Sequence, residues 1–595
     1  MEATFLAQNF VPIMFGGLLV LLLTGFPVAF ALAACGLGFG YIGMEAELFP
    51  PSLFQALPLR IFGIMQNDTL LAIPFFTFMG IILQKSGMAE DLLETVGQVF
   101  GPVRGGVAIA VILVGALLAA TTGVVAAAVI SMGLISLPIM LRYGYSRVIA
   151  TGAITASGTL AQAIPPSLVL IVLADQMGRS VGDMYAGALV PGLLLVCLYV
   201  IFIFLVAIFK PEMVPALPPE ARIYREANGK SGHVSLVFLL ILCTLVGYGW
   251  ALSHDSVMMA WMERTQAAPS DEVVIMSMAV TSLVALSLAI VNRVMGMGLL
   301  SKLAEQVTFV LMPPLILIFL VLGTIFLGVA TPTEGGAMGA LGALILAIGK
   351  RRLSMPLMNQ ALENTAKLAS FVLFILIGST VFSFTFNAAD GHIWVEHLFV
   401  DMPGGAIGFL IVVNILIFIL GMFIDFFEIA FIVIPILAPV AEKILPGMVP
   451  GMTADQAMIW FGVIVAMNLQ TSFLTPPFGF ALFYLRSVSP KNDYKDRITG
   501  ENIPAVKTTE IYKGSIAFIV LQLIMVASII AFPNLVTGGI QEGVKIDADA
   551  SLEQMLEAEN KSQGEQADEL RPESEQTTED DPAKALEADM KANKP

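Results

Sequence analysis

Charged residues are scarce in this chain of 595 residues. Asp, Glu, Lys and Arg make up 13% of it, while hydrophobic residues make up 57%. That balance lies far from the composition of an ordinary water-soluble domain. Much of the formal net charge of −16 is local, because residues 541–595 alone hold 16 acidic and 6 basic residues. The sequence therefore predicts an all-α polytopic protein of the lipid bilayer, followed by an acidic disordered tail.

Residues that hold disulfides, metals or nucleotides are also few. The three cysteines, Cys35, Cys197 and Cys243, lie in apolar runs, so neither a disulfide framework nor a cysteine metal site is expected. His392 and His397 are five residues apart and would not share a helix face, which argues against a histidine site. No Gly-x-x-x-x-Gly-Lys-Ser/Thr loop is present. We expect no enzyme, no cofactor and no nucleic-acid partner.

The first apolar run lacks the basic residues of a secretory signal. Leu32-Ala33-Ala34-Cys35 has the spelling of a lipoprotein cleavage site, but no Lys or Arg precedes Arg60, and the apolar run extends beyond Cys35. We therefore predict an uncleaved first transmembrane helix over 11–41, bent near Gly25-Phe26-Pro27.

Long apolar runs follow one another through most of the chain. A bilayer-spanning helix needs about 20 such residues. Predicted spans are 11–41, 105–138, 188–209, 234–252, 273–292, 307–330, 333–349, 368–387, 405–424, 426–440 and 514–532, with proline-interrupted segments at 54–84, 147–173 and 458–486. Basic residues gather in loops near 210–230, 293–302, 350–352 and 486–497, which places those loops in the cytoplasm. The acidic loops 255–272 and 390–401 are then outside.

Two stretches combine a short polar run with a double proline inside apolar sequence. They are Thr155–Ser167, with Pro165-Pro166, and Asn468–Pro477, which ends in Pro476-Pro477. Two adjacent prolines should break a helix, and a broken helix in lipid is tolerated only where protein or a water-filled cavity satisfies its backbone. An ordinary proline-containing loop is the alternative for either copy alone. The recurrence indicates a secondary transporter whose discontinuous helices bind substrate and ions.

The two stretches also align as parts of a repeat. Setting one double proline on the other aligns the preceding helices at Ser136-Leu137-Pro138 and Leu437-Ala438-Pro439. We predict an inverted structural repeat with two re-entrant helical hairpins. The predicted domains are 1–50, an N-terminal scaffold helix; 51–209 and 301–490, the two repeats; 210–300, an inserted helix pair; 491–540, a C-terminal helix; and 541–595, the tail.

Several motifs resemble those of one known family. They are Ala156-Ser157-Gly158-Thr159 with Ile164-Pro165-Pro166-Ser167, Ala330-Thr331-Pro332-Thr333-Glu334, Gly421-Met422-Phe423-Ile424-Asp425, and Asn468-Leu469 with Leu474-Thr475-Pro476-Pro477. In this order they resemble the large membrane subunit of tripartite ATP-independent periplasmic (TRAP) transporters, over about residues 11–490. Residues 210–300 depart from shorter members, and Gln470 stands where many members carry an acidic residue.

The resemblance implies a sodium-driven importer of organic acids in the bacterial inner membrane. Its partners would be a periplasmic substrate-binding protein and a small four-helix membrane subunit, and it would work as an elevator. A symporter of the same superfamily that needs no binding protein, and a non-transporting subunit of a membrane complex, are the alternatives. The organic acid stays open among four-carbon dicarboxylates, 2-oxo acids, sialic acids and others.

The polar residues of these stretches suit sodium, a hard cation that prefers oxygen ligands. Ser157, Thr159 and Thr471 add hydroxyls to the free carbonyls of broken helices. An ionisable residue such as Asp425, between phenylalanines, usually marks an ion or proton pathway in a membrane, although it could also lie at an interface. The expected sodium ligands are Ser157, Gly158, Thr159, Asp425, Asn468 and Thr471. The expected substrate contacts are Thr121, Pro165, Thr331, Glu334, Thr475 and Pro476.

Overall fold

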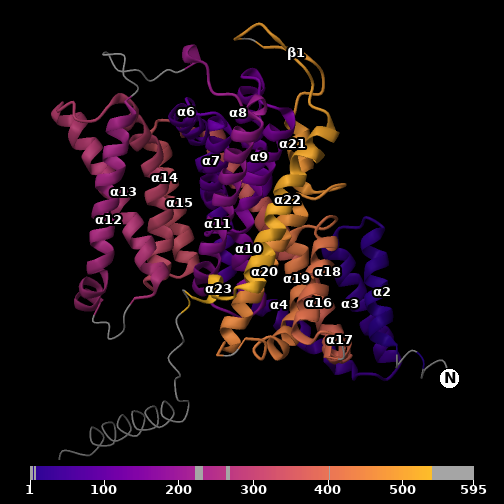
Figure 1. Ribbon diagram of the computed structural model, residues 1–595. Coiled ribbons are helices and arrows are strands. Elements are labelled where there is room, and N and C mark those ends of the chain that lie inside the picture. Colours follow the sequence, from indigo (N-terminus) through magenta and orange to yellow (C-terminus); the bar gives the residue numbers. More distant parts are fainter. Residues whose placement is uncertain are drawn as a thin grey trace, which may run out of the picture. The chain divides into compact units, whose positions relative to one another are not determined.

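The described part of the chain is almost wholly helical. The computed structural model describes residues 5, 9–221, 232–262, 268–400, 403–449, 451–496, 498–538 and 540. Ten helical segments among them are long and apolar enough to cross a membrane. The strands described are β1 (Tyr494–Lys495) and β2 (Asn502–Ile503), an antiparallel pair. The prediction of an all-α polytopic membrane protein is confirmed (Figure 1). The predicted tail, 541–595, lies outside the described residues.

The helices follow one another with short connections. In the first half they are α2 (Phe10–Leu23), α3 (Val28–Glu45), η1 (Pro51–Ala56), α4 (Leu57–Met65), η2 (Asp68–Leu71), α5 (Ala72–Lys85), α6 (Met88–Phe100), α7 (Gly106–Thr122), α8 (Val125–Arg142), α9 (Arg147–Thr159), η3 (Leu160–Gln162), α10 (Leu168–Gln176) and α11 (Val181–Phe209). Then come η4 (Pro211–Met213), η5 (Pro219–Ala221), α12 (His233–Met262), α13 (Ser270–Met295), α14 (Lys302–Phe326), α15 (Pro332–Gly349), α16 (Met355–Ala388), α17 (Gly391–Val400), α18 (Gly405–Leu420), α19 (Phe426–Ile444), α20 (Ala454–Phe473), α21 (Phe480–Val488), α22 (Thr508–Ala531) and α23 (Asn534–Thr537).

The N-terminal prediction of one bent helix over 11–41 is wrong. The chain forms two helices, α2 and α3, and the Phe10 ring lies edge-on against the rings of Phe39 and Phe49. The start of α2 therefore packs on the end of α3, and the pair is antiparallel. Gly25, with φ +80°, turns the chain, and Pro27, which has no N–H, stands just before α3.

The single span predicted over 105–138 is also wrong. Helix α7 ends at Gly123, which has φ +60°, and α8 returns against it. A left-handed glycine after the last helical residue is a common way to end a helix. The flanking residues are valines and alanines, so the hydropathy of the run conceals the turn. We call α7, α8 and the turn between them hairpin 1.

A second hairpin is formed by α18 and α19, joined by the turn Gly421–Ile424; we call it hairpin 2. Its open end lies near α17, because Lys443 of α19 pairs with Glu396 at 2.5 Å. The open end of hairpin 1 lies near β1 and β2, because Arg142 of α8 pairs with Asp496 at 3.1 Å. Figure 1 shows β1 and α17 at opposite ends of the helices. The two hairpins therefore enter from opposite ends, as an inverted repeat requires.

The inserted pair α12 and α13 packs beside α14. Its described core includes the buried Cys243 and Ala285, and His254 lies 3.1 Å from Glu272 across the two helices. The long helix α16 packs on α3 so closely that Gly378 meets the backbone of Ala29. These arrangements frame the two broken helices. The proposed domain boundaries remain a prediction.

Candidate functional site

The first double proline does interrupt a helix. Helix α9 ends at Thr159, η3 adds one tight turn, and α10 begins at Leu168 after the cis peptide Pro165-Pro166. Neither proline can donate a backbone hydrogen bond, so the helix cannot continue through them. The Ser167 hydroxyl donates to the Gln162 carbonyl at 3.0 Å and so satisfies one freed oxygen. We call residues 160–167 the first break.

The second double proline interrupts α20 and α21 in the same way. Helix α20 ends at Phe473, the cis peptide Pro476-Pro477 follows, and α21 begins at Phe480. The Thr475 hydroxyl donates to the Thr471 carbonyl at 2.8 Å, and the Tyr512 hydroxyl of α22 donates to the Pro477 carbonyl at 2.8 Å. We call residues 474–479 the second break. The prediction of two discontinuous helices is confirmed.

Each hairpin tip rests on the break of its own half. Gly123, in the tip of hairpin 1, is so close to α10 that an added Cβ would lie 3.0 Å from Leu168 Cγ. Gly421, in the tip of hairpin 2, is so close to α20 that an added Cβ would lie 2.8 Å from Ser472 Cβ. The rings of Phe423 and Phe478 lie 5.0 Å apart. Glycine thus lets backbone approach backbone where helix carbonyls are released.

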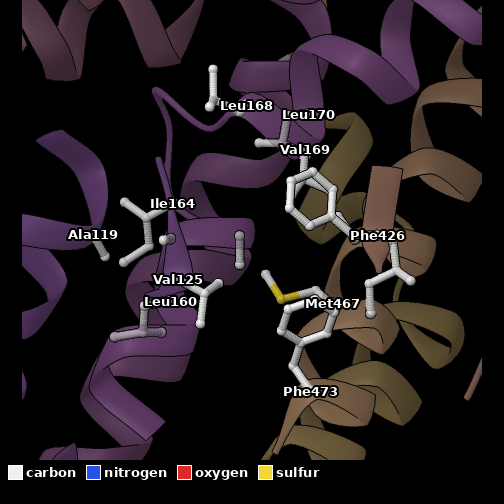
Figure 2. Packing of buried hydrophobic residues seen from close by; sticks show 14 of the residues in the cluster. Ala119, Val125, Leu160, Ile164, Leu168, Val169, Leu170, Phe426, Met467 and Phe473 are labelled. Carbon is white, nitrogen blue, oxygen red and sulfur yellow. The ribbon is translucent and has the colours of Figure 1, made fainter. Parts of the chain in front are cut away.

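The two breaks also approach each other. Figure 2 shows Leu160, Ile164 and Leu168–Leu170 opposite Phe426, Met467 and Phe473. These side chains are buried, and α10 packs against both α19 and α20. An apolar layer of this kind holds the two halves in contact and lowers the dielectric around the polar groups at each break.

The predicted sodium ligands of the first half are all buried. Ser157 and Thr159 have no exposed surface, and their hydroxyls donate to the carbonyls of Ile154 and Ala156 at 3.0 and 2.9 Å. Gly158 lies against α8 of hairpin 1, with an added Cβ 3.2 Å from Val129 Cα. Because each hydroxyl proton is donated within the helix, the hydroxyl oxygens remain available as acceptors or ligands.

The predicted ligands of the second half are tied to hairpin 2. Asn468 donates from Nδ2 to both oxygens of Asn414 in α18, at 2.7 Å for the carbonyl and 2.9 Å for Oδ1. The Thr471 hydroxyl donates to the Met467 carbonyl at 3.0 Å. Asn468 Oδ1 is therefore oriented by the amide that anchors α20 to the hairpin.

Asp425 has a structural role that the sequence did not reveal. It is the N-cap of α19, where its Oδ1 accepts from the Phe426 N–H at 2.7 Å and Glu428 Oε2 accepts from the Asp425 N–H at 3.1 Å. The two acids form a capping box, which helix N-termini favour. The carboxylate thus stands at the tip of hairpin 2, half-buried, with helix donors around it.

The predicted substrate contacts fall into two groups. Pro165, Thr475 and Pro476 lie in the breaks, and Thr121 lies at the end of α7, where its hydroxyl donates to the Leu118 carbonyl at 2.9 Å. Thr331 and Glu334 form a capping box at the start of α15. That helix packs mainly on α5 and α14, so the structure does not bring these two residues to the breaks.

A buried polar cluster escaped prediction. The Tyr199 hydroxyl of α11 accepts from Gln522 Nε2 of α22 at 2.8 Å and from Gln470 Nε2 of α20 at 3.3 Å. Gln522 Nε2 also lies 3.4 Å from Thr159 Oγ1. Among the described residues, the amide oxygens of Gln162, Gln470 and Gln522 have no partner. A glutamine inside apolar α22 was a signal, but its partners lie hundreds of residues away.

Comparison with known proteins gives a consistent result. The model of the family described as "Tripartite ATP-independent periplasmic transporter, DctM component" matches residues 15–268 and 272–535. The C4-dicarboxylate TRAP transporter large permease protein DctM of Pseudomonas aeruginosa is 26% identical over 74% of this chain and 82% of its own. The sialic acid TRAP transporter permease protein SiaT of Haemophilus influenzae is 22% identical over 80% of this chain and 60% of its own. Among solved structures, the Alcanivorax borkumensis YdaH transporter matches with a TM-score of 0.40 and 14% identity, covering 81% of this chain and 88% of that one.

Proposed function

The chain belongs to the DctM component of the tripartite ATP-independent periplasmic transporters, and from this premise we propose that it imports an organic acid together with sodium ions. It acts in the bacterial inner membrane as the large permease subunit. The observation that carries the proposal is the pair of broken helices, each covered by a hairpin tip, entering from opposite ends. Half-helix ends of this kind supply carbonyls to cations and N–H groups to anions.

Sodium would bind at the two breaks. At the first, the oxygens of Ser157 and Thr159 and the carbonyl of Gly158 are buried beside hairpin 1. At the second, Thr471 and Asn468 Oδ1 face hairpin 2, with Asp425 at its tip. Neutral oxygens with one carboxylate suit a hard monovalent cation. Since both sites involve a hairpin tip, bound sodium would hold each tip closed on its break.

Substrate would bind next to the hairpin tips. The relatives' names mention C4-dicarboxylate and sialic acid, both of which carry carboxylates. We propose a carboxylate as the shared chemical feature of the cargo. Transport would proceed by an elevator movement of the hairpins and broken helices past a scaffold that includes α3 and α16. A small four-helix membrane subunit and a periplasmic binding protein are the proposed partners.

The test is uptake into proteoliposomes that contain the permease, its small membrane subunit and an imposed sodium gradient. We expect uptake of the organic acid only when the binding protein and the gradient are both present. Uptake with sodium alone would support the alternative of a symporter that needs no binding protein. Failure of a screen of carboxylates under all conditions, with correctly inserted protein, would favour a non-transporting subunit.

A further inference from the structure

A cavity of about 490 Å³ lies between α5, the tip of hairpin 1 and α16. Its polar lining consists of Thr77, Gln84, Lys85, Thr122, Asn364 and Lys367. The remaining wall is apolar and includes Val124, Ala126 and Phe371. We call this space the α5–α16 cavity. It touches the hairpin tip but none of the residues predicted above to bind sodium or substrate.

Two hydroxyls in the wall are buried and unsatisfied. Thr77 and Thr122 are 3% and 2% exposed, and neither Oγ1 has a hydrogen-bond partner among the described residues. Thr121, the neighbour of Thr122, uses its hydroxyl on a helix carbonyl instead. A buried hydroxyl without a partner is costly, so the two threonines are set to bond a ligand or water inside the cavity.

The same wall carries positive charge. Lys85 and Lys367 line the cavity, and none of the described residues that line it is acidic. Lys367 Nζ lies 2.6 Å from Glu363 Oε1, but both side chains are largely exposed, at 69% and 64%. Exposed i,i+4 pairs are weak, so a bound anion can compete for the ammonium group.

Gln84 fixes the geometry of this wall. Its Nε2 donates to the Ala127 carbonyl at 3.2 Å and also contacts Ser131 Oγ, which ties α5 to α8 behind the tip. The cavity therefore presents cations and hydroxyl donors on a partly apolar wall, the combination that matches a carboxylate with a carbon body.

We propose that the α5–α16 cavity binds the carboxylate of an organic acid, with Lys367 as its main cationic partner and Thr77 and Thr122 as hydrogen-bond donors. The proposal rests on the function proposed above, because it names the place where the cargo contacts hairpin 1. Lys367 and Phe371 also line a second cavity, of about 850 Å³, which reaches Glu428 of hairpin 2. Lys367 is thus placed where an anion could be passed between the two hairpins.

The test uses full-length permease in which Cys35, Cys197 and Cys243 are replaced and Ala126 is changed to Cys. The rates of modification by an anionic and a cationic methanethiosulfonate are compared. We expect the anionic reagent to react about tenfold faster, because a charged cleft concentrates counter-ions to at least that extent. Lys367→Met should remove this preference. Lys491→Met, which changes an exposed loop lysine outside the cavity, should leave it intact.

A ligand arm completes the test. Succinate or N-acetylneuraminate should slow the modification of Ala126→Cys more than neutral succinamide does, and Thr122→Val should weaken that protection. Equal reagent rates, or no protection beyond that of succinamide, would overturn the proposed site. The readout needs no sodium gradient, so protection without sodium-driven uptake would refute the proposed function alone, and uptake without protection would refute the cavity alone.

Discussion

Asp425 allows charge to be separated from helix capping. Its carboxylate begins α19 and accepts the Phe426 N–H at 2.7 Å, while the Glu428 side chain closes the capping box. Asn caps a helix about as well as Asp, so Asp425→Asn should change stability by no more than about 0.3 kcal/mol. Asp425→Ala loses the cap and should cost about 1 kcal/mol.

The two variants should differ in stability but agree in transport. If the carboxylate neutralises a bound sodium ion, both substitutions remove that charge. We expect at least a tenfold rise in the sodium concentration for half-maximal uptake, equivalent to about 1.4 kcal/mol of binding free energy. The capping function, in contrast, survives only in Asp425→Asn.

The assay pairs thermal unfolding in detergent with sodium-dependent uptake in proteoliposomes. The expected pattern is a near-normal unfolding temperature with impaired uptake for Asp425→Asn, and losses in both for Asp425→Ala. If Asp425→Asn transports with the sodium dependence of the parent, Asp425 serves only as a cap. The sodium site at the second break would then consist of neutral oxygens alone.

Three further predictions concern other parts of the chain. Ser157→Ala and Thr471→Ala should each raise the sodium concentration needed for half-maximal uptake, and unchanged dependence in both variants would remove these hydroxyls from the ion sites. The Thr499 N–H and the Arg142 guanidinium lower the pKa of Asp496 to about 2, so this carboxylate stabilises the loop 489–507 above its unfolded pKa of about 4, and the stabilisation is lost as pH falls through about 2. Pepsin should cut this loop faster relative to a reference peptide at pH 2 than at pH 4, whereas Asp496→Asn should show the same relative rate at both; a pH-independent wild type would contradict the assignment. Truncation after Ile540 should leave uptake and thermal stability near those of the parent, since the acidic composition of 541–595 gives it little apolar surface to pack, and a collapse of either would show that the tail docks.

The breaks were predictable because their cause is local. Pro165-Pro166 and Pro476-Pro477 cannot continue a helix whatever surrounds them. The polar residues before each double proline were therefore recognisable as a site in an apolar setting. The presence of many long apolar helices followed equally directly from composition.

The hairpins were not predictable from hydropathy. Gly123 turns the chain between valines and threonines, and the turn before α3 interrupts a run that is apolar on both sides. Hydropathy measures transfer into lipid and is insensitive to a tight turn made of apolar residues. Tyr199 and Gln522 were missed for another reason, because their contact joins helices far apart in the sequence.

The most direct test of the central claim is coupled flux of ²²Na⁺ and labelled substrate in the same proteoliposomes. Using the organic acid found in the uptake screen, with binding protein present, we predict that adding substrate stimulates ²²Na⁺ entry in a fixed ratio. The Ser157→Ala/Thr471→Ala double variant should lose both fluxes together. Substrate entry with no accompanying ²²Na⁺, at any sodium gradient, would contradict sodium coupling through the two broken helices.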